Sequence, residues 1–434
     1  MKSFLKKIIP EKLFEFLKSF YYFFLNKYKT YYYRFFQFRY KKIVRQVRKK
    51  DKIKVAFFLI HEAVWKYEGV YRLMEKDERF DPVVIICPYI LYGETTMFKE
   101  MDQAYNSFFN RGYHVISTYD KNSKKWLDIK EMVDPDIVFF TNPHPLTKDE
   151  YYIGNFPKTL TCYVPYTFQT TYHYNQNYNR FFHNVLWKAY YQTDIHKKIA
   201  AKYAMNRAKN VVVTGYPGID GFLKEGEYRL DKKRTDSKKK IIWAPHHTIE
   251  GEGMDLNFSN FLRYHGFIIE LAKEYRHKIF ITFKPHPNLR PKLNKIWGQE
   301  KTDRYYKFWQ ENDFCALNEG DYQKLFIESD AMIHDCDSFL GEYLALNKPV
   351  LYTDHDNHVK DRLNEFGKPA FDMHYHAKNE REIMNFIVDV VLNEDDRMEK
   401  MRENWVKKYI IPPNSKKASV NIFVDLKNSL EIGE

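Results

Sequence analysis

Four polar segments in the second half of the sequence each follow a short apolar run of the kind that forms a buried strand. They span residues 244–248, 284–287, 334–338 and 353–356, and they contain His, Lys, Asp and Ser side chains. In doubly wound folds, ligands bind where the carboxyl ends of parallel strands meet at one edge of the sheet. These segments therefore predict a shared functional site.

A phosphate ester is the ligand that these side chains suit. His286 stands between Pro285 and Pro287, so it lies on a stiff loop from which its imidazole can donate to a diphosphate oxygen. Lys284 adds a positive point charge beside it. We therefore predict that His286 is the catalytic side chain and that Lys284 and Pro285 belong to the diphosphate site.

The stretch that begins at Ser338 predicts a helix running to Leu346. The Ser338 hydroxyl and the following backbone N–H groups would bind an anion, and Glu342, one turn further on, can accept from ribose hydroxyls. The plainer alternatives are that Asp335 or Asp337 only caps this helix and that Pro-His-Pro is only a rigid turn. NAD and P-loop sites are excluded, because the sequence has neither G-x-G-x-x-G nor G-x-x-x-x-G-K-[ST].

His246 and His247 are neighbours in the sequence, and a metal site is the alternative use of such a pair. Adjacent histidines rarely chelate one ion, and no E-x-x-H spacing accompanies them. We therefore predict no metal and no cofactor.

Strands alternate with helical stretches along residues 51–410, which is typical of βαβ units with a mostly parallel sheet. The predicted strands are 54–60, 82–88, 114–117, 136–140, 159–164, 210–214, 240–244, 278–283, 331–334 and 349–352. The predicted helices are 64–77, 94–112, 194–209, 258–276, 301–312, 321–329, 338–346 and 379–409. The fold class is therefore α/β, with two Rossmann-like doubly wound domains at 51–223 and 241–410 that face a cleft. A charged linker at 224–240 and a C-terminal tail at 411–434 complete the division.

Composition limits the class of protein. The chain has 434 residues, of which 44% are apolar and 29% are charged, so it can bury a sizeable core. No apolar run approaches the ~20 residues that a spanning helix needs. The four cysteines lie far apart without C-x-x-C spacing, which argues against a disulfide framework and fits a reducing compartment. Secretion is not expected, because the basic N-terminus lacks an apolar core and a cleavage site.

The excess positive charge lies in one segment. Residues 1–50 hold 15 Lys and Arg against 2 Asp and Glu, which equals the net charge of +13 of the whole chain. Aromatic residues alternate with these cations, so a helix formed here would lie in the interface of an anionic membrane. The alternatives are a basic arm that packs on protein and a site for single-stranded nucleic acid. Nucleic acid is disfavoured because the rest of the chain is electrically neutral.

The motifs of residues 155–360 resemble those of the CDP-glycerol glycerophosphotransferase family, the teichoic-acid primases and polymerases. The matching segments are Gly215-Tyr216-Pro217, Ala244-Pro245, Lys284-Pro285-His286-Pro287, Ser329-Asp330, His334 to Ser338 with Glu342, and Lys348-Pro349-Val350. The resemblance implies a GT-B fold and transfer of a polyol phosphate from a CDP-activated donor to a lipid-linked glycan acceptor, with CMP leaving. It also implies that His286 contacts the donor diphosphate, and that Pro245, His246, Ser338 and Glu342 line the nucleotide pocket.

Three positions depart from the family pattern. The family has Trp-His-Gly-Thr-Pro in its first domain, with the His as general base, whereas this chain has Cys162-Tyr163-Val164-Pro165-Tyr166. His144 or His173 would have to substitute for that base, or the base is absent, and Tyr166 is a further candidate for the acceptor side. Gly218 replaces an expected Arg, and Asp337 replaces the first of two Ser residues. A negative Asp337 would repel a phosphate unless it binds a sugar hydroxyl.

Three hypotheses follow. The first is a transferase on the cytoplasmic face of the membrane, peripheral to it, that moves glycerol phosphate or a related polyol phosphate from CDP during synthesis of a teichoic-acid-like or capsule-like polymer. The second is a GT-B glycosyltransferase that uses a sugar nucleotide. The third is a membrane-docked binding protein without catalysis, suggested by the missing His of the first domain.

Overall fold

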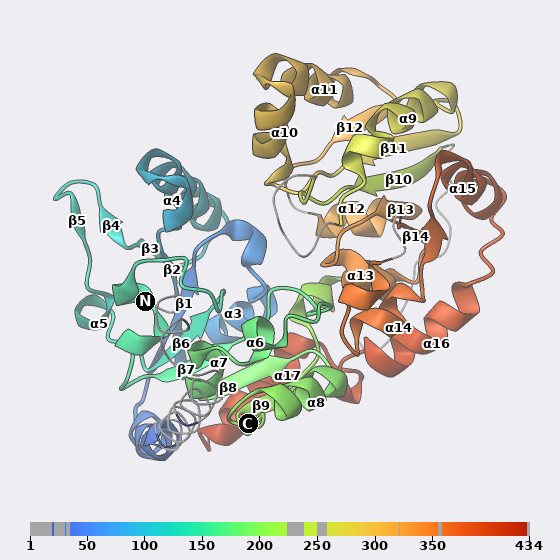
Figure 1. Cartoon of the computed structure of the whole chain (residues 1–434). Coiled ribbons are helices and arrows are strands. Elements are labelled where there is room, and N and C mark those ends of the chain that lie inside the picture. The colour runs from blue at the N-terminus through green and yellow to red at the C-terminus, as the bar shows by residue number, and fades with distance from the viewer. Residues whose placement is uncertain are drawn as a thin grey trace, which may run out of the picture.

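The computed structural model describes residues 20, 31, 35–223, 238–249, 258–320, 322–354 and 358–431. Most of the predicted linker at 224–240 lies outside these residues, as do most of residues 1–34 and residues 355 and 356 of the fourth polar segment. Two parallel sheets organise the described residues, each with its own helices (Figure 1).

The first sheet has seven parallel strands in the order β3-β2-β1-β6-β7-β8-β9. The strands are β1 (Ile53–Leu59), β2 (Phe80–Ile86), β3 (Val115–Ser117), β6 (Ile137–Phe140), β7 (Leu160–Tyr163), β8 (Lys188–Tyr191) and β9 (Val211–Val213). The helices of this domain are α3 (Glu68–Glu75), α4 (Glu94–Asn110), α5 (Ile129–Met132), α6 (Tyr174–Tyr178), α7 (Phe181–Val185) and α8 (Asp194–Tyr203). A hairpin of β4 (Tyr119–Asp120) and β5 (Lys125–Trp126) stands apart from the sheet.

The second sheet has six parallel strands in the order β12-β11-β10-β13-β14-β15. The strands are β10 (Lys239–Ala244), β11 (Ile279–Phe283), β12 (Cys315–Leu317), β13 (Ala331–His334), β14 (Val350–Thr353) and β15 (Tyr375–Ala377). The helices are α9 (Phe261–Glu274), α10 (Leu289–Trp297), α11 (Gln299–Glu311), α12 (Gln323–Glu328), α13 (Phe339–Glu342), α14 (Gly367–Phe371), α15 (Glu380–Asn385) and α16 (Glu399–Tyr409). The strands read as apolar runs in the sequence because both faces of a parallel sheet are covered.

In each sheet, the direction in which successive strands of the chain are added reverses at one point. The first sheet grows from β1 through β2 to β3 on one side and from β6 to β9 on the other, so its switch point lies between β1 and β6. The second sheet has its switch point between β10 and β13. Ligands of open α/β sheets bind beside the strand ends at such points.

Several predicted helices are shorter than expected. The helix predicted over 338–346 is α13, a single turn, followed by a 3-10 turn at Tyr343–Leu346. The helix predicted over 379–409 is three pieces, because a π-helical stretch at Phe386–Leu392 and a turn separate α15 from α16. Strands β8, β12 and β15 were not predicted, because their sequences, KAYY, CAL and YHA, contain no Val or Ile.

The segment at 411–434, expected as a tail, contains helix α17 (Ala418–Ser429), which returns to the first domain. Ile422 and Leu426 of α17 are fully buried in the core of that domain. The Asp220 carboxylate accepts from the backbone N–H groups of Ala418 and Ser419 at 2.8 and 2.9 Å, which fixes the start of the helix. Figure 1 shows α17, in red, among the elements of the first domain.

The described part of the basic N-terminal segment is a helix over residues 35–47 that packs on the first domain. Phe36, Tyr40, Ile43 and Val47 form its buried face. The Tyr40 hydroxyl bonds with Thr161 Oγ1 at 2.7 Å and donates to the Val185 carbonyl at 2.6 Å. This stretch therefore packs on its own protein, which is one of the alternatives drawn from the sequence. No helix among the described residues has the length and apolar character to cross a membrane.

The two domains share an apolar contact that is formed by the loop after β7. Phe168 of this loop stacks on Phe366 with ring centroids 5.1 Å apart, and Asn364 donates to the Gln169 carbonyl at 2.7 Å. A Cβ on Gly341 would lie 2.7 Å from the Phe168 ring, so glycine is required at this approach. The loop after β7 therefore lies directly against the segment that follows β13.

Candidate functional site

The ends of β10 and β13, at the second switch point, are held together by Asp335. Its carboxylate accepts from the backbone N–H groups of His246 and Asn260, and its side chain is buried. Burial raises the pKa of Asp335 to about 7, and the two hydrogen bonds oppose that shift. Asp335 thus positions the backbone of the loop that carries His246 and does not cap helix α13.

The loop after β11 lies beside the loop after β10. The backbone N–H of His286 donates to the Pro245 carbonyl at 3.3 Å, and that of Lys284 donates to the Trp243 carbonyl at 2.8 Å. The three rings of His246, His247 and His286 consequently form a cluster, with centroid distances of 4.2 to 5.2 Å. The structure therefore brings together the first two of the predicted segments.

The hydrogen bonds of the cluster fix the tautomers of two rings. The backbone N–H of Asn288 donates to His286 Nδ1 at 3.1 Å, and that of Thr248 donates to His246 Nδ1 at 3.3 Å. The Nδ1 atom of each neutral ring is therefore an acceptor, and its proton lies on Nε2. Both rings present an N–H donor.

These donors are uncharged and have positive neighbours. Burial lowers the pKa of His286 to about 3, with His247, Lys284 and Lys292 adding to the effect. Burial likewise lowers the pKa of His246 well below its usual value. Lys284 is buried and donates to the Gly320 carbonyl at 3.1 Å. Neutral N–H donors beside two lysines suit a phosphate oxygen.

The same three histidines have nitrogen atoms within 4.8 Å of one another, which is close enough for them to share a metal ion. A histidine that binds a metal through Nε2 needs its lone pair on that atom, and its Nδ1 then donates to a second group. In His246 and His286 the Nδ1 atoms accept instead. The donor set fits an anion better than a cation.

Asp337 and Ser338 lie next to this cluster. Asp337 Oδ1 is 3.8 Å from His246 Nε2, and burial raises the pKa of Asp337 to about 6. The Ser338 side chain makes no hydrogen bond to the start of α13, and its carbonyl accepts from Thr167 Oγ1 of the first domain at 3.4 Å. Because α13 is one turn long, its dipole contributes little to anion binding, and the imidazoles and lysines carry more of that role.

Glu342 lies in a different environment from the histidines. It is 2% exposed and accepts from the Tyr322 hydroxyl. That hydroxyl accepts in turn from Lys66 of the first domain at 2.6 Å. Burial raises the pKa of Glu342, and the Lys66 charge opposes the shift. In this structure Glu342 therefore takes part in the contact between the domains.

The first-domain candidates occupy three places. Tyr166 follows β7 near Asp337; burial raises its pKa to about 12, and the Asp337 charge adds to this shift. His173 precedes α6 and stacks on Tyr172, with centroids 4.7 Å apart. His144 follows β6 at the first switch point, and burial, followed by the Arg180 charge, lowers its pKa to about 4. Of the three, Tyr166 is the one whose pKa the charge of a predicted donor residue, Asp337, affects.

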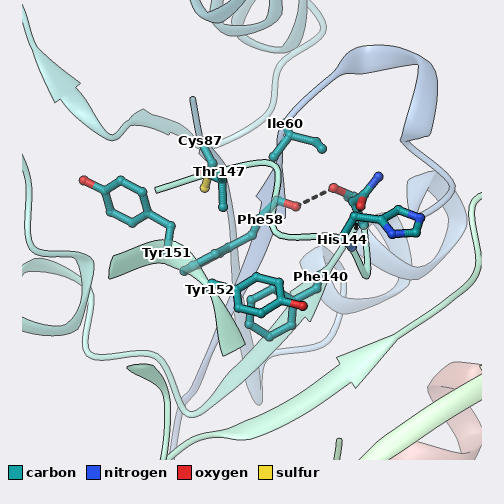
Figure 2. Close-up of a pocket in the computed structure, with 10 residues that line it drawn as sticks. Phe58, Ile60, Cys87, Phe140, His144, Thr147, Tyr151 and Tyr152 are labelled. Atoms are coloured by element: carbon teal, nitrogen blue, oxygen red, sulfur yellow. Dashed lines mark hydrogen bonds between the residues drawn. The ribbon is translucent and has the colours of Figure 1, made fainter. Parts of the chain in front are cut away.

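His144 lines a small pocket at the first switch point (Figure 2). Its ring points away from the apolar side chains of Ile60, Cys87 and Tyr151 that line the same pocket. Two other lining residues are joined by a hydrogen bond, in which the Thr141 hydroxyl donates to the Phe58 carbonyl at 2.8 Å. This pocket belongs to the first sheet and is separate from the histidine cluster.

The sequence did not predict the partners Lys66, Tyr322 and Lys292. Lys66 and Tyr322 are 256 residues apart in the chain, and nothing in either local sequence indicates that they meet. Lys292 lies on α10, one turn beyond Pro-His-Pro, and a search for cations near His286 on the following helix would have found it.

A family model described as CDP-glycerol:poly(glycerophosphate) glycerophosphotransferase matches residues 168–423. A teichoic acid poly(ribitol-phosphate) polymerase of Bacillus spizizenii is 31% identical over 179 residues, which are 38% of this chain and 25% of the relative. The chain thus spans about a quarter of the length of that relative.

Solved structures show the same fold. A variant of the wall teichoic acid polymerase TagF has a TM-score of 0.58 at 13% identity, over 88% of this chain and 90% of that chain. A UDP-GlcNAc 2-epimerase from Neisseria meningitidis, bound to UDP-GlcNAc, has a TM-score of 0.51 at 16% identity, over 88% and 100% of the two chains. These likenesses confirm the predicted GT-B-like fold of two Rossmann-like domains. Since the family model covers more than half of the residues, the chain belongs to the CDP-glycerol:poly(glycerophosphate) glycerophosphotransferase family.

Proposed function

We propose that this protein transfers glycerol phosphate, or a related polyol phosphate, from a CDP-activated donor to a lipid-linked glycan during synthesis of a teichoic-acid-like or capsule-like cell-surface polymer. The observation that supports this best is the pair of imidazole N–H donors, His246 and His286, beside Lys284 at the second switch point. Family membership supports the same reaction. CMP is the leaving group.

In the proposed reaction an acceptor hydroxyl oxygen attacks the phosphorus that bears the polyol. The bond from that phosphorus to the bridging oxygen breaks, and the electron pair leaves on CMP. His286 and His246 donate to the diphosphate oxygens on which negative charge grows, and Lys284 and Lys292 stabilise that charge further. Fixed donors in a site of low polarity are among the largest contributions to such catalysis.

The matching relative is a poly(ribitol-phosphate) polymerase, and the matching family is described by glycerophosphate. Glycerol and ribitol are therefore the two donors to test first.

The proposed location is the cytoplasmic face of the membrane, to which the protein binds peripherally. The helix over 35–47 exposes Phe35 and Phe38, which are 52% and 76% exposed, on the side away from its buried face. The exposed cations of this helix are Lys41, Lys42 and Arg45. Exposed aromatic rings beside cations suit an anionic lipid surface. No role for nucleic acid is proposed.

A nucleotide panel tests the donor. We expect CMP and CDP to raise the melting temperature of the full chain more than UDP or GDP does, and CDP-glycerol or CDP-ribitol to release CMP when a lipid-linked acceptor is present. A larger effect of UDP or GDP would favour the sugar-nucleotide glycosyltransferase. Nucleotide binding without CMP release from either donor would favour the binding protein without catalysis.

A further inference from the structure

Transfer to a hydroxyl requires a group that takes up the hydroxyl proton. Tyr166, in the loop after β7, is unsuited because burial raises its pKa to about 12, so the phenol keeps its proton at neutral pH. His144 is a weak base, since burial lowers its pKa to about 4, and it lines the separate pocket of the first sheet. The remaining first-domain candidate, His173, stacks on Tyr172 ahead of α6, and a carboxylate on the donor side of the junction competes with it for this role.

Asp337 lies where the two domains meet. Its Oδ1 atom is 3.8 Å from His246 Nε2, so the carboxylate borders the proposed diphosphate site. Its backbone carbonyl accepts from Thr170 Oγ1 of the first domain at 3.2 Å, and the neighbouring carbonyl accepts from Thr167 Oγ1. The loop after β7 thus holds the Asp337 backbone in place. The side chain is 29% exposed, so a substrate hydroxyl can reach it.

The surroundings of Asp337 favour proton uptake. Burial raises the pKa of Asp337 to about 6. Its carboxylate is therefore a stronger base than that of an ordinary aspartate, and it is still mostly ionised at pH 7. The titratable groups that face it are His246 after β10, Tyr166 after β7, Tyr352 on β14, and its chain neighbours Asp335 and Cys336. None of these is a cation at neutral pH, because burial keeps His246 uncharged.

We propose that Asp337 is the general base of the reaction. The Asp337 carboxylate accepts the proton of the acceptor hydroxyl while the hydroxyl oxygen forms its bond to phosphorus and CMP leaves with the electron pair of the bridging bond. The carboxylic acid then returns its proton to solvent. This inference rests on the proposed transferase function, and it gives the Asp in place of the first Ser a chemical role.

The competing interpretation is structural. Leu340 donates its backbone N–H to the Asp337 carbonyl at 3.3 Å, and the Asp337 carboxylate accepts from the Ser338 backbone N–H. These bonds alone would explain a short polar residue before α13. A test must therefore separate proton transfer from shaping of the turn.

The test compares the full-length protein with Asp337→Asn and Asp337→Ala, using CMP release from CDP-glycerol and CDP-ribitol with a synthetic lipid-linked glycan as acceptor. We expect kcat to fall at least 100-fold in both variants, while CMP affinity by calorimetry changes less than threefold. Sodium formate should restore kcat at least tenfold in Asp337→Ala and not in Asp337→Asn, because formate fits only the space left by alanine. The wild-type rate should fall about tenfold per pH unit below pH 6, and this acid limb should be absent in Asp337→Asn.

Asp303→Asn is the matched control, since Asp303 lies on the surface of α11 in an ion pair with Arg290. It should keep the wild-type rate and pH profile. Wild-type turnover in Asp337→Ala, or loss of turnover without rescue by formate, overturns the assignment of the base and leaves the transferase function standing. Failure of the wild type to release CMP from either donor overturns the proposed function, and this inference with it.

Discussion

Single residues of the site were predicted where they follow a strand directly. His246, Lys284, His286 and Asp337 each stand within a few residues of a short apolar run, so the sequence alone places them at one sheet edge. The tautomers of the histidines could not be predicted, because they depend on backbone N–H groups of residues two positions on, which meet Nδ1 only in the folded loop. The partners of Glu342 could not be predicted either, because Lys66 comes from the other domain.

The first prediction concerns His286. His286→Ala should lower kcat at least tenfold, because one donor to the developing charge of the diphosphate is lost. His286→Gln should keep part of the rate, since its amide N–H can donate from a similar position. Because the pKa of His286 is lowered to about 3, its contribution should not titrate between pH 5 and 8.

Steady-state CMP release measures both variants, and His277→Ala is the control because His277 is exposed at the end of α9. A variant His286→Ala that turns over at the wild-type rate would contradict the role given to this imidazole. A fall in rate above about pH 6.5 that disappears in His286→Gln would show that the charged form acts instead.

Elements were predicted well where apolar runs are long and poorly where packing interrupts a helix. β1, β2, β10 and β11 have five to seven residues each and match their predicted ranges closely. The α-helix expected from Ser338 ends after one turn. The next four residues form a 3-10 turn, and Asn347, which follows it, has a left-handed backbone conformation. The periodicity of the N-terminal segment predicted an amphipathic helix, but only the structure separates the face that packs on protein from the face that is exposed.

A second prediction belongs to this N-terminal helix. The full-length double variant Phe35→Ser/Phe38→Ser should bind vesicles containing anionic phosphatidylglycerol at least tenfold more weakly than the wild type at low salt. The reason is that each exposed ring would contribute about 1.5–3 kcal/mol when buried in lipid. The melting temperature should stay unchanged, because the buried face formed by Phe36, Tyr40, Ile43 and Val47 is retained.

Vesicle co-sedimentation measures the binding, with Phe109→Ser as the control. Phe109 is 61% exposed but lies on α4, away from the N-terminal helix. Equal binding of the double variant and the wild type would contradict a membrane role for this exposed face. Weakened binding of Phe109→Ser as well would indicate unspecific adsorption.

At the scale of the whole molecule, the two-domain division could be predicted, because strand and helix patterns restart after a charged stretch. The way the domains join could not. The junction depends on contacts between residues far apart in the sequence, such as Phe168 with Phe366, and on the return of α17 to the first domain. The junction also contains a titratable side chain, His196 of α8, which is fully buried. The centroid of its ring lies 4.5 Å from that of Phe366 in the second domain.

This ring makes the junction sensitive to acid. Burial lowers the pKa of His196 to about 3, against a usual value of 6.5 in the unfolded chain. Between these values the unfolded chain binds more protons than the folded one, so the free energy of unfolding decreases as the pH falls below 6.5. At pH 5 the loss of unfolding free energy from this group approaches about 2 kcal/mol.

The variant His196→Phe removes the titrating group and keeps an aromatic ring against Phe168 and Phe366. We expect the melting temperature of the wild type to fall several degrees more than that of His196→Phe between pH 7 and pH 5. Other buried histidines contribute to the fall in both proteins, so only the difference between the two counts, and an equal fall in both would show that protonation of His196 does not open the junction.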